Sequence, residues 1–288
     1  MFTNLTHLSS LDFSHNQLVG PIPSDVSGLQ NLTTINLSYN RLHGPIPSSI
    51  FKLVNLTRFE LSSNNLSGTL DPYMFAKLKS LKRLNVSHNS LSLGTAVEFD
   101  TFLEEISLRW LELSDNKIHG HVPNWVWDMG KSSLHFLDLS YNFLTDIQQF
   151  IQMKNLEYLD LSYNLLQGSL PVPPSLLTFF SASHNKLTGV IPPSFCNLSS
   201  IEYLDLSDNS LYGTVPQCLG NSTTIMVMDL RTNYFSSMPQ IFGRHNQLTT
   251  LNLNGNKLEG PLPPSLMNCD QLHVLDLGNN MINDTFPH

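Results

Sequence analysis

The chain has 288 residues with 15 Lys+Arg and 23 Asp+Glu, which give a formal net charge of −8. This balance argues against a nucleic-acid partner, because binding to phosphates requires a basic surface, and no apolar run is long enough to insert this segment into a membrane. Charged residues make up only 13% of the chain, so its 28 Asn, 34 Ser and 18 Thr must supply most of the polar surface.

One motif repeats along almost the whole chain at a fixed period. The pattern LxxLxLxxN ends at Asn16, Asn40, Asn64, Asn89, Asn116, Asn142, Asn164, Asn185, Asn209, Asn233, Asn256 and Asn280. The mean spacing between these residues is 24. We therefore expect a single domain over residues 1–288, made of about twelve repeats of 24 residues.

Apolar residues stand eight, five and three positions before each Asn, as at Leu8, Leu11 and Phe13 in the first repeat. Two apolar residues separated by one polar residue predict a short strand with one buried face. One repeat buries about seven apolar side chains at roughly 2 kcal/mol each. Ordering its backbone costs on the order of 1 to 2 kcal/mol per residue, so a single coil does not fold alone. Stacked coils share their strands in a parallel ladder and bury a continuous core.

The Asn recurs where the chain turns out of each predicted strand. There its amide can donate to and accept from backbone groups that a tight turn leaves unpaired, and each lost partner would cost roughly 1 to 3 kcal/mol.

Most repeats continue after the Asn as xLxGxIP or a close variant, as in NQLVGPIP at Asn16 and NKLTGVIP at Asn185. This phrase resembles the plant extracellular class of leucine-rich repeats, and the match covers nearly the whole chain. The resemblance implies an α/β fold, a right-handed leucine-rich-repeat solenoid (horseshoe). It would have a parallel concave β-sheet and short 3-10 or irregular convex segments.

The pattern is least regular in the middle and at the ends. Residues 92–107 lack the GxIP turn and carry several acidic residues, which suggests an insertion or two fused repeats. In this repeat class the terminal caps usually carry paired Cys, and neither end here offers a Cys pair. The resemblance therefore implies an internal segment of a longer ectodomain, the alternative being a short protein with unusual caps.

The position six residues before each Asn faces the concave side and carries aromatic rings in five consecutive repeats. These residues are Trp110, Phe136, Tyr158, Phe179 and Tyr203. Rings on neighbouring strands about 5 Å apart would form a continuous strip, and exposed aromatic patches concentrate binding energy. The competing explanation is that these aromatic residues belong to the common consensus of the repeat and have no role in binding.

Charged residues share the same face. The position four residues before each Asn is mostly acidic or amide and includes Asp138, Asp160 and Asp205. Acidic residues are part of the repeat consensus at this position, so they more often support the fold than form a binding site. Arg58, Lys82, Arg83 and Arg109 cluster beside the start of the aromatic strip. This cluster is predicted either to dock a carboxylate or to neutralise Glu60 and Glu112.

Nine N-x-S/T sequons fit a secreted, glycosylated surface; they are Asn4, Asn31, Asn36, Asn55, Asn65, Asn85, Asn197, Asn221 and Asn283. Glycans on Asn36 and Asn85 would cover part of the concave face.

Cys196 and Cys218 stand on adjacent coils, away from the sheet, so their Cα atoms could approach within disulfide range. Cys269 is interpreted as a buried thiol.

No catalytic motif is present, so we expect no enzymatic activity and no cofactor. Asp115, His119 and His121 could be imagined as a metal site, but they straddle a turn where other repeats place Ser, Thr and Pro. Ordinary loop residues are the favoured interpretation.

The repeats at Leu204 and Leu251 look like those of plant receptor-like proteins of the disease-resistance type. This resemblance implies a receptor at the outer face of the plasma membrane that binds a peptide or protein ligand and signals through a co-receptor kinase. Two alternatives remain. One is a secreted inhibitor similar to polygalacturonase-inhibiting proteins, which hold a microbial wall enzyme on an acidic concave face. The other is a truncated product without autonomous function.

Overall fold

The computed structural model of the chain describes residues 5–26, 28–75, 77–94, 106–131, 133–146 and 153–285. Two compact units are present: Met1–Leu144 with Gln152–Leu156, and Thr145–Ile151 with Glu157–His288. The predicted irregular segment 92–107 lies largely outside the described residues. The candidate sequon at Asn4 lies outside them as well.

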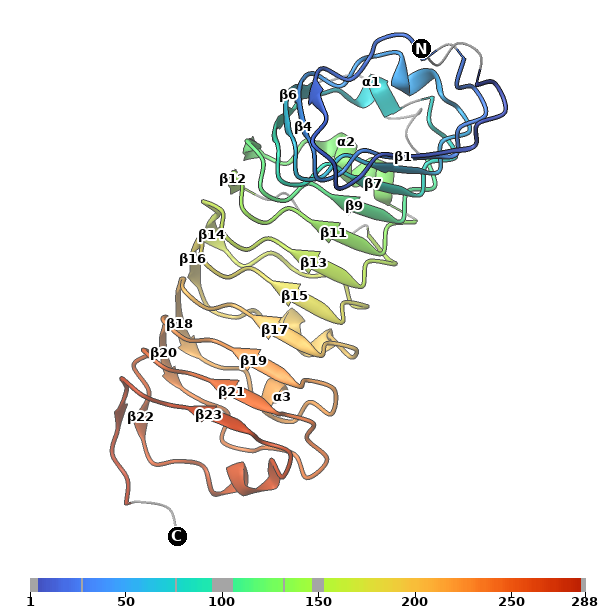
Figure 1. The fold of residues 1–288 in the computed structure, drawn as a ribbon. Helices are drawn as coiled ribbons and strands as arrows, with labels where there is room; N and C mark the ends of the chain where they lie inside the picture. Colours follow the sequence, from blue (N-terminus) through green and yellow to red (C-terminus); the bar gives the residue numbers. More distant parts are fainter. Residues whose placement is uncertain are drawn as a thin grey trace. The chain divides into compact units, whose positions relative to one another are not determined.

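The first unit contains a parallel sheet with one strand from each successive coil, in chain order (Figure 1). Its strands are β1 (Ser10–Asp12), β3 (Thr34–Asn36), β5 (Arg58–Glu60), β7 (Arg83–Asn85), β9 (Trp110–Glu112) and β11 (Phe136–Asp138). Equivalent residues of the repeat are aligned across the ladder, for example Arg58 with Arg83 and Trp110 with Phe136.

The second unit contains a sheet built in the same way. Its strands are β13 (Tyr158–Asp160), β15 (Phe179–Ser181), β17 (Tyr203–Asp205), β19 (Val227–Asp229), β21 (Thr250–Asn252) and β23 (Val274–Asp276). The predicted short strand with one buried face is confirmed in both units. Leu111 and Leu159, for instance, are buried in the middle of strands whose neighbouring residues are half-buried.

A second set of strands, two to six residues long, follows the Asn turns and pairs into small side sheets. In chain order they are β2 (Val19–Gly20), β4 (Arg41–Gly44), β6 (Asn65–Leu70), β8 (Ser90–Leu93), β10 (His119–His121), β12 (Phe143–Asp146), β14 (Gln167–Ser169), β16 (Lys186–Gly189), β18 (Ser210–Thr214), β20 (Tyr234–Ser237), β22 (Glu259–Gly260) and β24 (Met281–Ile282).

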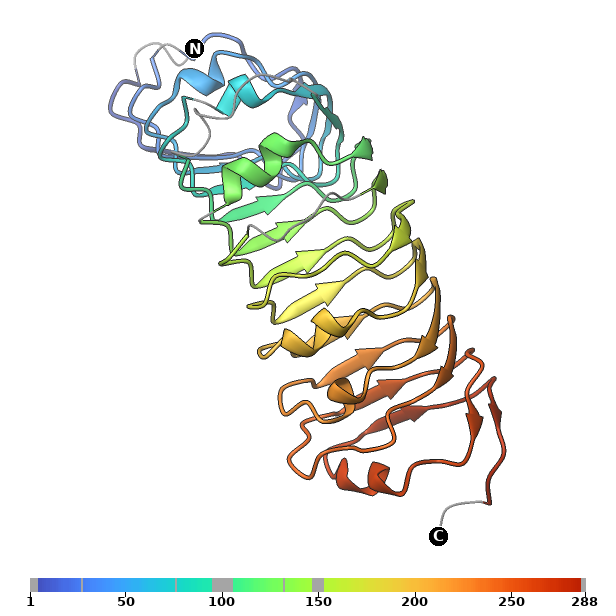
Figure 2. The ribbon, with the colours of Figure 1, turned by 180° about the vertical axis from the view of Figure 1, so that it is seen from behind.

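Short helical segments lie on the side of the coils opposite to the sheet, as Figure 2 shows from behind. The first unit has η1 (Ile50–Lys52), α1 (Pro72–Phe75) and α2 (Asn124–Gly130), and the second has η2 (Pro193–Asn197), α3 (Gln217–Gly220) and η3 (Pro264–Asn268). None of the helices formed by the described residues has the length and apolar character needed to cross a membrane.

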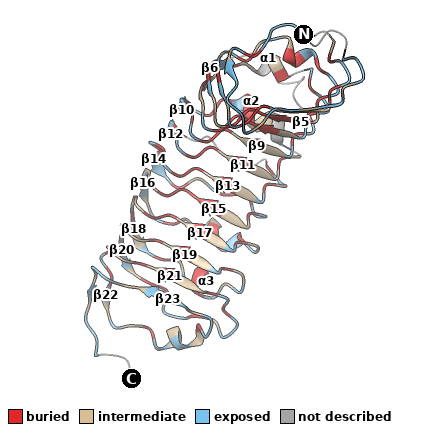
Figure 3. Ribbon diagram, in the orientation of Figure 1, coloured by how far each residue is buried: buried red, intermediate tan, exposed pale blue. Residues whose placement is uncertain are grey.

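The core fills the inside of the coils, where the buried positions are red in Figure 3. Leu32, Leu56 and Leu81 are at most 1% exposed and occupy the same position in successive repeats. Because the strands of successive coils pair in register, these buried positions follow one another from coil to coil and form a continuous core.

The repeated Asn side chains bond backbone groups of their own turns, as predicted, and they also bond backbone groups of the preceding coil. Asn64 donates through Nδ2 to the carbonyl oxygens of Leu37 and Leu61 at 3.0 and 3.1 Å. Its Oδ1 accepts from the backbone N–H of Leu42 at 3.0 Å. Asn209 repeats the pattern with Ala182, Leu206 and Leu187.

On the far side of the second unit, Cys196 and Cys218 form a disulfide between adjacent coils, with a Cα–Cα distance of 5.5 Å. Cys269 is a free, buried thiol.

Candidate functional site

The face of each main sheet that points away from the core carries the residues singled out by the sequence. In the first unit, the rings of Trp110 and Phe136 stack with centroids 3.7 Å apart and planes inclined by 3°. The guanidinium of Arg83 lies on the Trp110 ring, 4.2 Å from its centroid. We call these three residues the first-unit stack.

In the second unit, the rings of Tyr158, Phe179 and Tyr203 stack across three neighbouring strands. The centroids are 4.2 Å apart between Tyr158 and Phe179 and 4.6 Å apart between Phe179 and Tyr203. We call these residues the second-unit stack.

Within each unit, the predicted aromatic residues stack on one another, as a pair in the first unit and as a triplet in the second. Each ring is half-buried, because parallel strands hold equivalent side chains about 5 Å apart and flat rings at that spacing stack on one another. They therefore present edges and, for Tyr158 and Tyr203, phenol groups to a partner, rather than the flat faces that a simple strip would offer.

The basic cluster is partly neutralised, which is one of the two outcomes that the sequence allowed. Glu60 has only 5% of its side chain exposed, and its Oε1 pairs with the Nε atoms of Arg58 and Arg83 at 2.8 and 2.6 Å. Arg83 also reaches Glu112 at 3.3 Å, and the Trp110 indole N–H donates to the same Glu112 oxygen. The side chain of Arg58 remains 53% exposed, while Lys82 and Arg109 are exposed beside it.

Burial is the main cause of a raised pKa at Glu112, above its ordinary value of 4.5. The nearby carboxylates of Glu60 and Asp138 act in the same direction, whereas Trp110 and Arg83 oppose the shift.

This raised pKa sets a pH dependence of stability. The folded protein holds a proton on Glu112 at a pH where the unfolded chain has lost it, so the free energy of unfolding decreases as the pH rises from about 4.5 through the folded pKa. Relative to Glu112→Gln, the wild-type protein should therefore lose stability over this window. Urea unfolding of both proteins from pH 4 to pH 8 measures the difference, and a gap that stays constant with pH would contradict the assignment.

The acidic residues Asp138, Asp160 and Asp205 have a structural role at the turns. Each accepts a hydrogen bond from the backbone N–H two residues later, at 2.9 Å in all three cases. Ser140 adds its hydroxyl to Asp138 at 2.7 Å. The contacts agree with the scaffold interpretation of this position.

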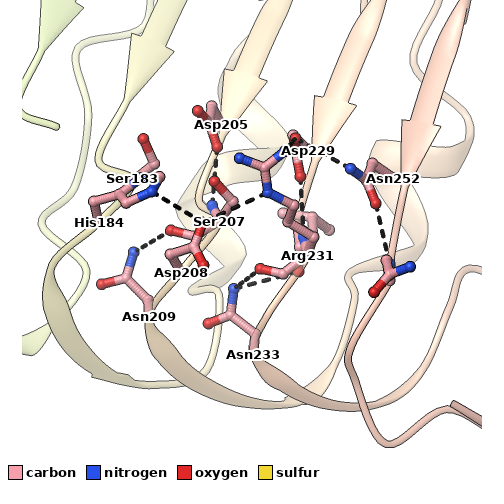
Figure 4. A network of polar contacts seen from close by, with 12 residues as sticks. Ser183, His184, Asp205, Ser207, Asp208, Asn209, Asp229, Arg231, Asn233 and Asn252 are labelled. Atoms are coloured by element: carbon pink, nitrogen blue, oxygen red, sulfur yellow. Dashed lines mark hydrogen bonds and ion pairs between the residues drawn. The ribbon is translucent and has the colours of Figure 1, made fainter. Parts of the chain in front are cut away.

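A polar network in the second unit was missed by the sequence reasoning (Figure 4). Asp208 Oδ2 lies 3.3 Å from His184 Nε2 and 3.5 Å from Arg231 Nε, and Arg231 Nη1 lies 3.4 Å from Asp229 Oδ2. Burial raises the pKa of Asp229. Burial is also the main cause of a raised pKa at Tyr203, and the negative charges of Asp205 and Asp229 raise it further.

One signal for this network was present in the sequence. The position two residues before each Asn is Ser in nine consecutive repeats, and Arg231 is the first residue to break that series.

The imagined metal site is not assembled. Asp115 pairs with His88 at 2.7 Å, and His119 stacks on Phe143 with ring centroids 4.7 Å apart. Within the described part of the chain, no three His, Cys, Asp or Glu side chains come together in a way that could hold a metal ion.

The sequons differ in accessibility. Asn31, Asn55, Asn65, Asn197, Asn221 and Asn283 are exposed, and Asn36 is half-buried with its Nδ2 donating to Asp12 at 3.2 Å. Asn85 is only 8% exposed, and its Oδ1 accepts from the backbone and hydroxyl of Ser87. We correct the prediction for Asn85, because a glycan cannot be carried on a buried amide engaged in the turn. A glycan at Asn85 therefore does not cover part of the concave face.

Leucine-rich repeat family models match residues 1–42, 44–91, 107–129, 132–173, 176–198, 200–222 and 247–269, together more than half of the chain. The chain belongs to the leucine-rich repeat family. The solenoid fold predicted from the repeat phrase is thereby confirmed, and the two stacks lie at the exposed positions of its repeat strands.

This leucine-rich repeat chain is similar to receptor-like proteins of plants. Receptor-like protein 7 of Arabidopsis thaliana is 34% identical over 155 residues, which cover 46% of this chain and 16% of that protein. The aligned part therefore spans only a small fraction of the relative's length.

Two solved plant receptor ectodomains share the fold. The leucine-rich repeat ectodomain of GASSHO1/SCHENGEN3 from Arabidopsis thaliana, in complex with CASPARIAN STRIP INTEGRITY FACTOR 2, is 30% identical with a TM-score of 0.82, covering 100% of this chain and 37% of that one. The Arabidopsis receptor kinase HAESA, in complex with the peptide hormone IDA and the co-receptor SERK1, is 30% identical with a TM-score of 0.76, covering 99% and 52%.

Proposed function

We propose that the chain is a ligand-recognition segment of the ectodomain of a plant cell-surface receptor-like protein. In this proposal it lies outside the plasma membrane, binds a peptide or protein, and acts in defence or developmental signalling through a partner receptor kinase. The supporting observation is the pair of ordered aromatic stacks on the open sheet faces, each bordered by charged groups. The solved HAESA structure in complex with the peptide hormone IDA supports the same class of ligand.

The geometry suits an extended peptide. Ring edges carry partial positive charge and attract carbonyl oxygens, while the phenol groups of Tyr158 and Tyr203 can donate or accept hydrogen bonds. Asp160 and Asp205 stand two residues further along the same strands. A peptide backbone, with donors and acceptors in alternation, matches such a surface. Because the rings are already held by stacking and half-buried, binding would order few side chains, which favours affinity.

The proposal is tested with a phage-displayed peptide library panned against the purified chain. We expect the selected peptides to lose at least about tenfold in affinity, or about 1.4 kcal/mol, in Trp110→Ala/Phe136→Ala or in Tyr158→Ala/Phe179→Ala/Tyr203→Ala. The matched control is Tyr212→Ala/Tyr234→Ala, which removes rings that are 54% and 49% exposed on the side sheet.

Circular dichroism of every variant separates loss of binding from loss of fold. Peptides that bind both stack variants as tightly as wild type, or that lose affinity only in the Tyr212/Tyr234 control, would reject the proposed surface.

The inhibitor alternative is favoured by one observation, the series of carboxylates at Asp160, Asp205 and Asp229 on the second unit. In this alternative, a secreted polygalacturonase binds to this face. Inhibition of such an enzyme by the purified chain, lost in Asp160→Asn/Asp205→Asn, would select this function over the receptor.

A further inference from the structure

The second unit has a cleft on its far side that neither aromatic stack uses. It measures about 280 Å³ and lies between the coil of η2 and the coil of α3. The Cys196–Cys218 disulfide joins these two coils and lines the cleft. The space falls just below the range of about 300 to 1,000 Å³ typical of drug-sized ligands, so it suits an occupant of the size of one sugar.

The sequon Asn221-Ser222-Thr223 forms part of the cleft wall. Asn221 is exposed and ends α3, and its backbone N–H bonds the carbonyl oxygens of Gln217 and Leu219. The hydroxyl oxygen of Ser222 accepts from the backbone N–H groups of Thr224 and Ile225, both at 3.3 Å. The backbone on both sides of Asn221 is therefore fixed, and a group attached to its side chain starts from a defined point at the cleft.

The cleft wall matches the chemistry of a pyranose ring. Phe195, Leu198 and Ile201 form an apolar side, and the hydroxyl-bearing residues Ser199 and Thr223 are exposed at the surface. A pyranose likewise has an apolar C–H side and hydroxyl groups around its rim. The second nearby sequon, Asn197, is exposed but does not line the cleft.

We propose that Asn221 carries an N-linked glycan and that its first N-acetylglucosamine occupies this cleft, covering the joint between the η2 and α3 coils. The donor class is an oligosaccharide joined to a lipid diphosphate. A bond forms between Asn221 Nδ2 and the anomeric carbon of the sugar, the bond from that carbon to the diphosphate oxygen breaks with its electron pair, and the lost Nδ2 proton is balanced by the released lipid diphosphate. This proposal does not depend on the ligand of the open sheet face.

The experiment uses the chain secreted from plant cells that make high-mannose glycans. Glycopeptide mass spectrometry reports occupancy, and hydrogen exchange reports protection of residues 193–201 and 219–226. Thr223→Ala and Asn221→Gln both abolish the sequon, whereas Thr223→Ser keeps it and serves as the matched control. Asn197→Gln removes the neighbouring sequon without touching the cleft.

We expect Asn221 to be occupied in wild type and in Thr223→Ser. Exchange in the two segments should be on the order of fivefold faster in both sequon-free variants, and unchanged in Asn197→Gln. Trimming wild type with an endoglycosidase that leaves the first sugar should preserve the protection, and complete removal of the glycan should abolish it.

Three results would each overturn the proposal. These are an unmodified Asn221, an occupied Asn221 whose loss leaves exchange unchanged, and protection that disappears already on trimming to the first sugar.

Discussion

Asn142→Ala is expected to lower the free energy of unfolding by about 4 kcal/mol, roughly 1 kcal/mol for each backbone group left without a partner. Asn142 is 5% exposed. Its Nδ2 donates to the carbonyl oxygens of Leu113, Leu139 and Ser140 at 3.0, 3.1 and 3.0 Å, and its Oδ1 accepts from Ile118 N–H at 3.1 Å. Water has little access to replace these bonds, so the loss is not compensated.

A matched substitution separates hydrogen bonding from packing. Asn142→Asp keeps the shape and the bond from Ile118, but it turns a carboxylate oxygen toward carbonyl oxygens, so we expect it to destabilise at least as much as Ala. The control is Asn65→Ala in bacterially produced protein, where the Asn is exposed and the effect should stay within about 0.5 kcal/mol. Chemical denaturation measures all three. Equal stability of Asn142→Ala and the control would show that the repeated Asn does not hold the turn.

Glu60→Gln is expected to lower the free energy of unfolding by about 2 kcal/mol and to release the side chain of Arg83 from Trp110. Glu60 is nearly buried and holds two arginines through one oxygen. Removing one member of a buried ion pair costs about 3 to 5 kcal/mol. The expected value is smaller because the Arg58 and Arg83 side chains are 53% and 32% exposed and regain water.

The measurement combines urea unfolding with tryptophan fluorescence, since Trp110 reports the position of the guanidinium above it. Glu259→Gln is the control, because Glu259 is exposed on β22. A Glu60→Gln protein with wild-type stability and unchanged fluorescence would show that Glu60 does not organise this part of the sheet face.

The sequence predicts where the candidate sites lie, but it does not predict how their side chains are arranged. The period of the repeat places Trp110 and Phe136, or Tyr158 and Phe179, at equivalent positions of adjacent strands, so their proximity follows from the pattern alone. Whether the rings stack or splay depends on side-chain rotamers. The stacked arrangement changes what a partner meets, from ring faces to ring edges.

The sequence also does not show which charged side chains pair with one another. Arg83 had Glu60 and Glu112 within reach by register, and it contacts both. The network of His184, Asp208 and Arg231 joins three coils, and the residues before Asn185 and Asn209 that take part in it have left-handed backbone conformations, with φ of 52°. The direction of a side chain leaving such a turn is set by tertiary packing.

The repeat, the short strands with one buried face, the Asn turns and the face on which exposed residues gather were all predictable from the sequence. These follow from local periodicity, since a residue's position within a 24-residue coil fixes whether it points to the core or to solvent. The burial of Asn85, the pairing of Glu60 with two arginines and the cleft beside Asn221 were not predictable from the sequence, because they arise when the coils stack. The Arg83–Glu60 pair and the Cys196–Cys218 disulfide join residues 23 and 22 positions apart, and such contacts exist only after the coils have stacked.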